Sequence, residues 1–391
     1  MSRSVAVGID VGSYQIKAVV TEAQNAKERL FPRVLGTGFA EARGLRHGYV
    51  VSAPEVIRSL KLAIRQAEKS SGQKIKTVYL SIGGIGLGSI VSIGSTMITR
   101  ADSEITALDI EKVHEIAEND IPRPLMQNRK IIHSVPIQYK IDGVAALGYP
   151  EGMKGVRLDV KMLFITCLEH HVNDLIECAE AAGVRVEDVI ASPVAAGLVS
   201  LTKIQKLAGC ILANIGAETV SIIVYENNLP VSLDVFPIGS NDITNDIALG
   251  FKIAIEEAEG LKVGNFASSP YPRKKLEEII GARLSDIFEL IESHLKKIGR
   301  NGLLPAGIIL TGGGARISDI EDFAKISLRL PSKIAIVQNP AQKPTVQDST
   351  WTVAYGLTVI GHTGSAEESI GIKPENNIKE KIIRWLKQFL P

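Results

Sequence analysis

Cysteine is scarce in this sequence, and a long apolar run and an excess of either charge are both missing. The three cysteines (Cys167, Cys178 and Cys210) lack metal-ligand spacing, so we expect small buried side chains in a reducing compartment. No apolar run reaches the length of about 18 residues that spans a bilayer, and no signal-peptide pattern is present. The net charge of +1 argues against general nucleic-acid binding. We therefore expect a soluble, cytoplasmic protein.

The length predicts more than one domain. The chain has 391 residues, of which 45% are hydrophobic, enough for more than one buried core. Residues 84–161 read as a separate module, with a strand at 89–99, a helix at 108–119 and a strand at 130–141. Pro136 suits an edge position in the last of these strands, because proline lacks a backbone donor.

One stretch of the sequence occurs twice, about half a chain apart. In the first copy, near the N-terminus, two β-rich runs flank a tight turn at Gly12. Residues 210–225 repeat this pattern. Their alignment with the first copy places Gly216 on Gly12 and Asn214 on Asp10. Two such hairpins predict two similar halves that face one another.

Each hairpin allows two interpretations. Backbone N–H groups at a tight turn bind phosphate, and a neighbouring carboxylate such as Asp10 holds a metal ion through water. An ordinary β-turn is the simpler interpretation of either hairpin alone. The repetition favours phosphate binding.

Two further features of the second half are candidates for a binding site. Glu259 and Lys262 lie on one face of a predicted helix at 255–262, where a solvated ion pair is the simpler interpretation. An apolar strand at 306–310 then runs into the glycine-rich residues 312–315. Bare backbone there lets a base or a phosphate approach closely, although a plain turn has the same composition.

The C-terminal tail predicts a membrane anchor. Residues 362–376 are rich in Gly, Ser and Glu and indicate a flexible linker, and residues 377–391 predict an amphipathic helix. Such a helix suits the headgroup region of anionic lipid, whereas a terminal helix docked on its own core is the alternative. The membrane-facing side chains are Ile382, Ile383, Trp385, Leu386, Phe389 and Leu390, flanked by Lys381, Arg384 and Lys387.

Together these motifs resemble the actin/heat-shock-chaperone ATPase superfamily and, within it, the FtsA family of bacterial cell-division proteins. The two hairpins and residues 312–315 match the phosphate-1, phosphate-2 and adenosine motifs of the superfamily. More specific marks of the family lie at residues 44–48, 132–139, 152–158 and 239–247.

The resemblance implies an α/β fold, namely an actin-like two-lobed ATPase core with an FtsA-type 1C subdomain and a C-terminal amphipathic helix on a flexible linker. The implied divisions are subdomain 1A (1–83, 162–203 and 345–361), 1C (84–161), 2A (204–250 and 303–344), a trimmed 2B (251–302), the linker (362–376) and the helix (377–391).

The resemblance also implies ATP and Mg²⁺ as cofactors, with Asp10 towards the metal through water. The phosphates would meet Asp10, Gly12, Ser13, Tyr14 and Gln15 from one half, and Asn214, Gly216, Ala217, Glu218 and Thr219 from the other. Glu259 and Lys262 would meet the ribose or adenine, and Gly312, Gly313, Gly314 and Ala315 the adenosine.

The second hairpin departs from the family's pattern. Asn214 and Ser221 stand where the phosphate-2 motif has aspartates, and Ala217 replaces a glycine. An amide removes a negative charge from the outer shell of the metal, so we expect very slow hydrolysis. Whether the chain is an ATPase stays open, and no catalytic residue is assigned.

The family's partners are the tail of the tubulin-like protein FtsZ, further copies of the same chain and the anionic membrane surface. We expect filaments on the inner face of the cell membrane at the division site, with residues 84–161 contacting the next subunit. Arg283, on a predicted helix at 274–298, is the candidate for an acidic FtsZ tail. The alternatives are a PilM-like pilus-assembly scaffold and a small-molecule kinase.

Overall fold

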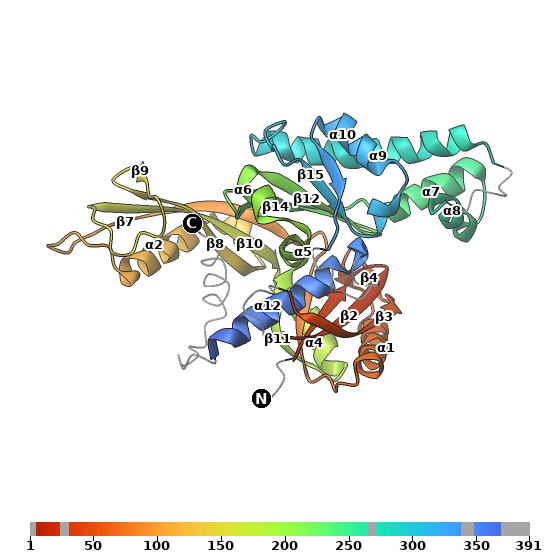
Figure 1. The fold of residues 1–391 in the computed structure, drawn as a ribbon, viewed down its shortest axis with the longest axis horizontal. Coiled ribbons are helices and arrows are strands. Elements are labelled where there is room, and N and C mark those ends of the chain that lie inside the picture. The colour runs from red at the N-terminus through yellow and green to blue at the C-terminus, as the bar shows by residue number, and fades with distance from the viewer. Residues whose placement is uncertain (1–4, 24–30, 265–270, 338–347, 369–391) are drawn as a thin grey trace.

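The computed structural model describes residues 5–23, 31–264, 271–337 and 348–368, which form two lobes and one inserted module (Figure 1). The first lobe lies at the lower right of Figure 1 and the second above it, while the module extends to the left. Each lobe is built on a five-stranded sheet and the module on a four-stranded one.

The first lobe places its N-terminal hairpin in the middle of its sheet. The strands run in the order β11-β6-β1-β2-β3, with β1 antiparallel to β2 and parallel to β6. Two helices, α1 (Ala53–Ser71) and α4 (Glu169–Ala181), belong to this lobe. The strand bounds are β1 (Val5–Val11), β2 (Gln15–Glu22), β3 (Arg33–Glu41), β6 (Thr77–Ile82) and β11 (Arg185–Ala191).

The second lobe repeats this sheet strand for strand. The order β16-β15-β12-β13-β14 has the same pattern of parallel and antiparallel pairs, so the prediction of two similar halves is confirmed. Its strands are β12 (Cys210–Ile215), β13 (Val220–Glu226), β14 (Leu229–Phe236), β15 (Ile308–Thr311) and β16 (Ser332–Ile334). Its helices are α6 (Lys203–Ala208), α7 (Ser240–Phe251), α8 (Ile255–Lys262), α9 (Arg273–Lys297) and α10 (Ile320–Leu328).

Helical spacing in the sequence explains how α9 covers the second sheet. Leu284, Phe288 and Ile291 recur three or four residues apart and are fully buried. They share one hydrophobic core with Ile222 and Val224 of β13. The core of the second lobe therefore lies between α9 and the sheet.

Two small-residue helices join the lobes. In α5 (Ser192–Ser200) and α12 (Thr352–Glu368), close contact requires glycine, because a Cβ on Gly356 would lie 1.9 Å from the carbonyl O of Ala195. The helices pack against each other as the small residues at 192–197 predict.

The inserted module has a separate core. Its sheet runs in the order β7-β10-β8-β9 and carries α2 on one face, where a Cβ on Gly94 would lie 2.2 Å from the carbonyl O of Val113. Pro136 on β8 lies opposite Met162 of β10, at a bulge. On its other side, β8 pairs with β9 only at Lys140 and Ile141, so among the described residues Pro136 has no strand partner there. This agrees with the edge position predicted for the proline. The elements are β7 (Gly88–Met97), α2 (Ala107–Asn119), α3 (Arg123–Met126), β8 (Arg129–Ile141), β9 (Val144–Ala145) and β10 (Arg157–Leu168).

Two predicted boundaries are wrong. The linker was expected to begin at residue 362, but α12 continues to Glu368. His362 lies in this helix with Nε2 2.9 Å from Oγ1 of Thr21, so contacts with the first sheet extend the helix through a segment whose composition indicates a linker. The module boundary at 161 also falls inside β10, which runs unbroken.

The predicted C-terminal helix at 377–391 lies outside the described residues. Among the residues that are described, no helix combines the length and the apolarity needed to span a bilayer.

Candidate functional site

The two hairpins have equivalent turns. The N–H of Gly12 donates to the carbonyl O of Gln15 at 3.2 Å, and that of Gly216 to the carbonyl O of Thr219 at 2.9 Å. The strand registers place Asp10 opposite Lys17 and Asn214 opposite Ser221, so the alignment predicted from the sequence holds residue by residue.

The turns also leave backbone donors available. The N–H groups of Ser13 and Tyr14 in the first turn, and of Ala217 and Glu218 in the second, meet no acceptor among the residues that the structure describes. Tyr14 is 64% exposed. Successive donors in a turn are suited to an anion.

Asp10 and Lys17 lie opposite each other on β1 and β2, behind the first turn. Ser81 Oγ on β6 donates to Asp10 Oδ1 at 3.0 Å, and Lys17 Nζ donates to the carbonyl O of Thr350 at 3.0 Å. Burial raises the pKa of Asp10 above its ordinary value, and the Lys17 charge opposes that rise. Burial likewise lowers the pKa of Lys17, which the Asp10 charge opposes. The sequence interpretation missed Lys17, although its place opposite Asp10 follows from strand alternation.

The glycine-rich residues after β15 pack directly on the second hairpin. Gly312 has φ +86°, and a Cβ there would lie 2.2 Å from Asn214 Oδ1 and 2.6 Å from the carbonyl O of Ile215. A Cβ on Gly313 would meet nothing within 4 Å. The structure thus brings the predicted phosphate-2 and adenosine motifs together and leaves open space beside Gly313.

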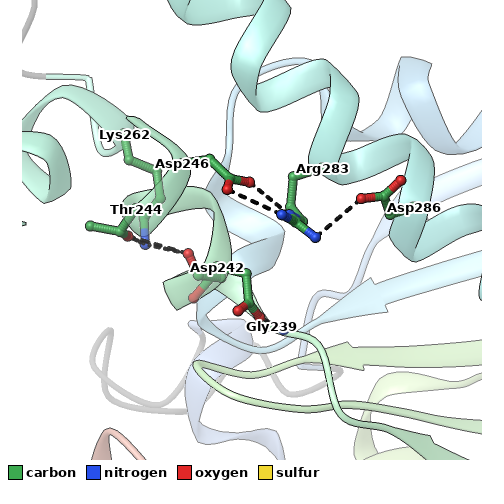
Figure 2. Close-up of polar contacts among 8 residues, drawn as sticks. Gly239, Asp242, Thr244, Asp246, Lys262, Arg283 and Asp286 are labelled. Atoms are coloured by element: carbon green, nitrogen blue, oxygen red, sulfur yellow. Dashed lines mark hydrogen bonds and ion pairs between the residues drawn. The ribbon is translucent and has the colours of Figure 1, made fainter. Parts of the chain in front are cut away.

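Lys262, the last residue of α8, is buried and points toward Thr244 of α7 (Figure 2). Its Nζ donates to Thr244 Oγ1 at 2.8 Å and to the carbonyl O of Ser240 at 3.1 Å, and it pairs with Glu259 Oε2 at 2.6 Å. The Lys262 side chain is 6% exposed and that of Glu259 44%, so a fully solvated pair is the wrong interpretation. The Ser240 N–H in turn donates to the carbonyl O of Gly216 at 2.9 Å, which links Lys262 to the second turn.

Arg283 is already paired in the structure (Figure 2). Its guanidinium donates to both carboxylate oxygens of Asp246 on α7, at 2.7 and 3.1 Å, and lies 3.1 Å from Asp286. The side chain is 30% exposed. An acidic peptide would therefore compete with two carboxylates for this arginine, and the FtsZ-tail site stays a prediction.

Glu218 differs from the other residues expected to surround the phosphates. Its carboxylate accepts a hydrogen bond from the backbone N–H of His47 in the first lobe. The sequence did not predict a contact between these two residues. The three cysteines are buried as predicted, and the described residues contain no cluster of three or more potential metal ligands.

Two family models and several curated relatives match this chain. The family model described as "Cell division protein FtsA" matches residues 211–356, and that of the "SHS2 domain inserted in FTSA" matches residues 88–166. The chain is similar to the cell division protein FtsA of Neisseria meningitidis, with 30% identity over 94% of this chain and 92% of that protein.

Solved structures share the fold at low identity. A chain of a PilM–PilN type IV pilus biogenesis complex is 18% identical with a TM-score of 0.67 over 92% of this chain and 99% of that chain. MreB5 of Spiroplasma citri bound to ADP is 13% identical with a TM-score of 0.54, over 94% of this chain and 99% of that chain. The predicted actin-like α/β fold is confirmed, and the chain belongs to the FtsA family of cell-division proteins.

Proposed function

We propose that this chain binds ATP with Mg²⁺ between its two lobes as an actin-like cell-division protein. The observation that carries the proposal is the repeated turn, which offers backbone donors from Ser13 and Ala217 in equivalent positions of two facing lobes. Such donors bind phosphate oxygens. The ADP bound to a structural neighbour of the same fold supports a nucleotide.

The residues behind the first turn fit a hydrated magnesium ion. Asp10 supplies the hard oxygen that Mg²⁺ prefers, and Ser81 fixes the orientation of that carboxylate. When bound, the metal would neutralise phosphate charge. Lys17 adds a second positive charge on the same side, and its hydrogen bond to the carbonyl O of Thr350 restricts its position.

We expect hydrolysis to be very slow. The second turn presents the neutral Asn214 and Ser221 where the first presents Asp10 and Lys17, and no carboxylate is assigned as a base. Nucleotide would then act mainly as a structural ligand that favours the closed arrangement of the lobes.

Isothermal titration calorimetry of the full chain tests this function. We expect one ATP per chain, bound more tightly with Mg²⁺ than without it, and very slow phosphate release in a parallel assay. The absence of ATP binding with Mg²⁺ present contradicts the site, and brisk phosphate release contradicts the structural role of the nucleotide.

Membership of the FtsA family supports a role as a membrane tether for the FtsZ ring. We propose that residues 377–391 bind anionic lipid reversibly and that filaments, in which residues 84–161 contact the next subunit, strengthen this binding by multivalency. Co-sedimentation with anionic vesicles should pellet the full chain and leave a form ending at Glu375 in solution. Equal pelleting would show that the tail is not the anchor.

A pilus-assembly scaffold is the second candidate, because a chain of the PilM–PilN complex has the same fold. Binding of an acidic FtsZ tail peptide separates the two. We expect the full chain to bind this peptide and Arg283→Glu to weaken the binding. If neither the wild type nor Arg283→Glu binds the peptide, the pilus scaffold is favoured. If the two bind it equally well, the peptide site does not include Arg283.

A further inference from the structure

The tip of the second turn is bonded to the first lobe. Glu218 Oε2 accepts a hydrogen bond from the backbone N–H of His47 at 2.5 Å. His47 Nδ1 lies 3.1 Å from the carbonyl O of Glu218, and the ring nitrogen must be the donor because a carbonyl only accepts. Two hydrogen bonds, both donated by His47 and both accepted by Glu218, therefore connect a single residue of each lobe.

The local backbone holds His47 in place. His47 and Gly48 form the turn between β4 (Leu45–Arg46) and β5 (Tyr49–Val50), with φ of +48° and +88°. A Cβ on Gly48 would lie 2.5 Å from the Cα of Gly84, so this turn packs directly against the chain entering the inserted module.

The same residue contacts the start of the module. The carbonyl O of His47 accepts a hydrogen bond from the N–H of Ile85 at 3.3 Å, three residues before β7 begins at Gly88. One peptide segment of the first lobe thus contacts both the second turn and the entry to the module.

The entry to the module is also bonded to the second lobe. Ser89 Oγ donates to the carbonyl O of Leu233 and accepts from its N–H, both at 2.8 Å. Leu233 lies on β14, which pairs with the strand that leaves the second turn. Residues 85–89 therefore bridge the two lobes, and a movement of one lobe against the other must alter one set of these bonds.

We propose that the His47–Glu218 contact couples nucleotide occupancy of the second turn to the position of the inserted module. Glu218 is then a positioning residue between lobes, and its carboxylate is not a phosphate ligand. The inference rests on the proposed nucleotide binding between the lobes. A ligand that brings the turns together favours the state in which His47 meets Glu218, and by linkage the contact favours the bound state.

Hydrogen–deuterium exchange of the full chain, with and without Mg·ATP, tests the coupling. In the wild-type protein we expect nucleotide to slow exchange in residues 84–97 by about fivefold or more. His47→Gly keeps the backbone donor and the positive φ but removes Nδ1. Glu218→Ala removes the acceptor for the backbone N–H. Both variants should lose most of the nucleotide-dependent slowing and bind Mg·ATP about threefold to tenfold more weakly.

Two further variants sharpen the test. Glu218→Gln keeps a carbonyl acceptor for the His47 N–H and should restore at least half of the slowing seen in the wild type. Glu187→Ala removes a surface carboxylate that pairs with Arg185 and should behave as the wild type. Thermal unfolding of each variant shows that it is folded.

The outcomes separate the inference from the proposed function. Wild-type slowing in both His47→Gly and Glu218→Ala overturns the coupling and leaves nucleotide binding intact. Loss of Mg·ATP binding in Glu218→Ala with wild-type behaviour in His47→Gly makes Glu218 a phosphate ligand and also overturns the inference. A wild-type protein that binds no Mg·ATP removes the proposed function itself, and the coupling with it.

Discussion

The two hairpins share one backbone register but differ in the charge of the side chains behind their turns. In the first lobe, Asp10 faces Lys17 behind the turn, while in the second lobe Asn214 faces Ser221 at the same register. The first turn therefore carries charge suited to a metal and phosphates, and the second carries none at these positions. In this duplicated fold, charged side chains therefore lie behind the turn of one copy and neutral side chains behind the turn of the other.

The second turn is instead fixed by packing. The N–H groups of Ser240 and Asn241 at the start of α7 donate to its carbonyl oxygens, at 2.9 and 2.8 Å, and Gly312 lies against Asn214. Glu218 extends to His47 in the other lobe. The close contact of Gly312 with this hairpin makes the second turn sensitive to steric change.

The largest expected effect follows from that packing. Gly312→Val adds a Cβ against Asn214 Oδ1 at a positive φ and should lower the free energy of unfolding by about 2–5 kcal/mol. Gly313→Ala is the matched control, because a Cβ there meets nothing within 4 Å. Its cost should stay below about 1 kcal/mol in urea denaturation. Equal losses in the two variants would contradict the packing.

A smaller effect concerns the module that only the first lobe carries. His133 on β8 accepts a hydrogen bond from the N–H of Ala191, at the end of β11, at 3.0 Å. Burial lowers the pKa of His133 from 6.5 to about 4. Between these values the unfolded chain binds more protons than the folded one, so stability falls as the pH falls.

This shift predicts a pH-dependent difference between two proteins. From about pH 7 to about pH 5, the wild type should lose about 2 kcal/mol more stability than His133→Gln. His171 and His362, whose pKa values burial also lowers, are present in both proteins and cancel in the comparison. Chemical denaturation at both pH values measures the difference, and parallel pH profiles would refute it.

The smallest expected effect comes from making the turns alike. Asn214→Asp places a carboxylate in the second turn at the position equivalent to Asp10. We expect phosphate release from Mg·ATP to rise about tenfold or more, because a carboxylate helps to position the metal and water. An unchanged rate would show that the missing carboxylate does not limit hydrolysis.

The parts of the fold that depend on local pattern were predictable from the sequence. Alternation and the Gly12 and Gly216 turns gave both hairpins in the correct register, and the helix predicted at 255–262 matches α8 at both ends. The strand β3 was not predicted, because the residues after the first hairpin are poor in Ile and Val and were interpreted as a connection. Gly36 and Gly38 lie in this strand. Their missing side chains let α1 pack on the strand, where a Cβ on Gly38 would lie 2.1 Å from the carbonyl O of Ala63.

Contacts between distant segments were beyond sequence reasoning. The bond from His47 to Glu218 joins residues 171 positions apart, and no local pattern marks it. Lys262 was predicted on the correct helix, but its burial depends on Ser240 and Thr244 of α7. The turns of the site could therefore be predicted from the sequence. The side-chain contacts between distant segments became visible only in the structure.

The most direct test of the account is a pair of Mg·ATP titrations of the full chain at equivalent positions. Lys17→Met removes the charge from the first hairpin, and Ser221→Ala changes the position that corresponds to it in the second. We expect Lys17→Met to weaken binding about 10–100-fold and Ser221→Ala less than about threefold. Wild-type affinity in Lys17→Met, or equal weakening in both variants, would contradict the division of tasks between the hairpins.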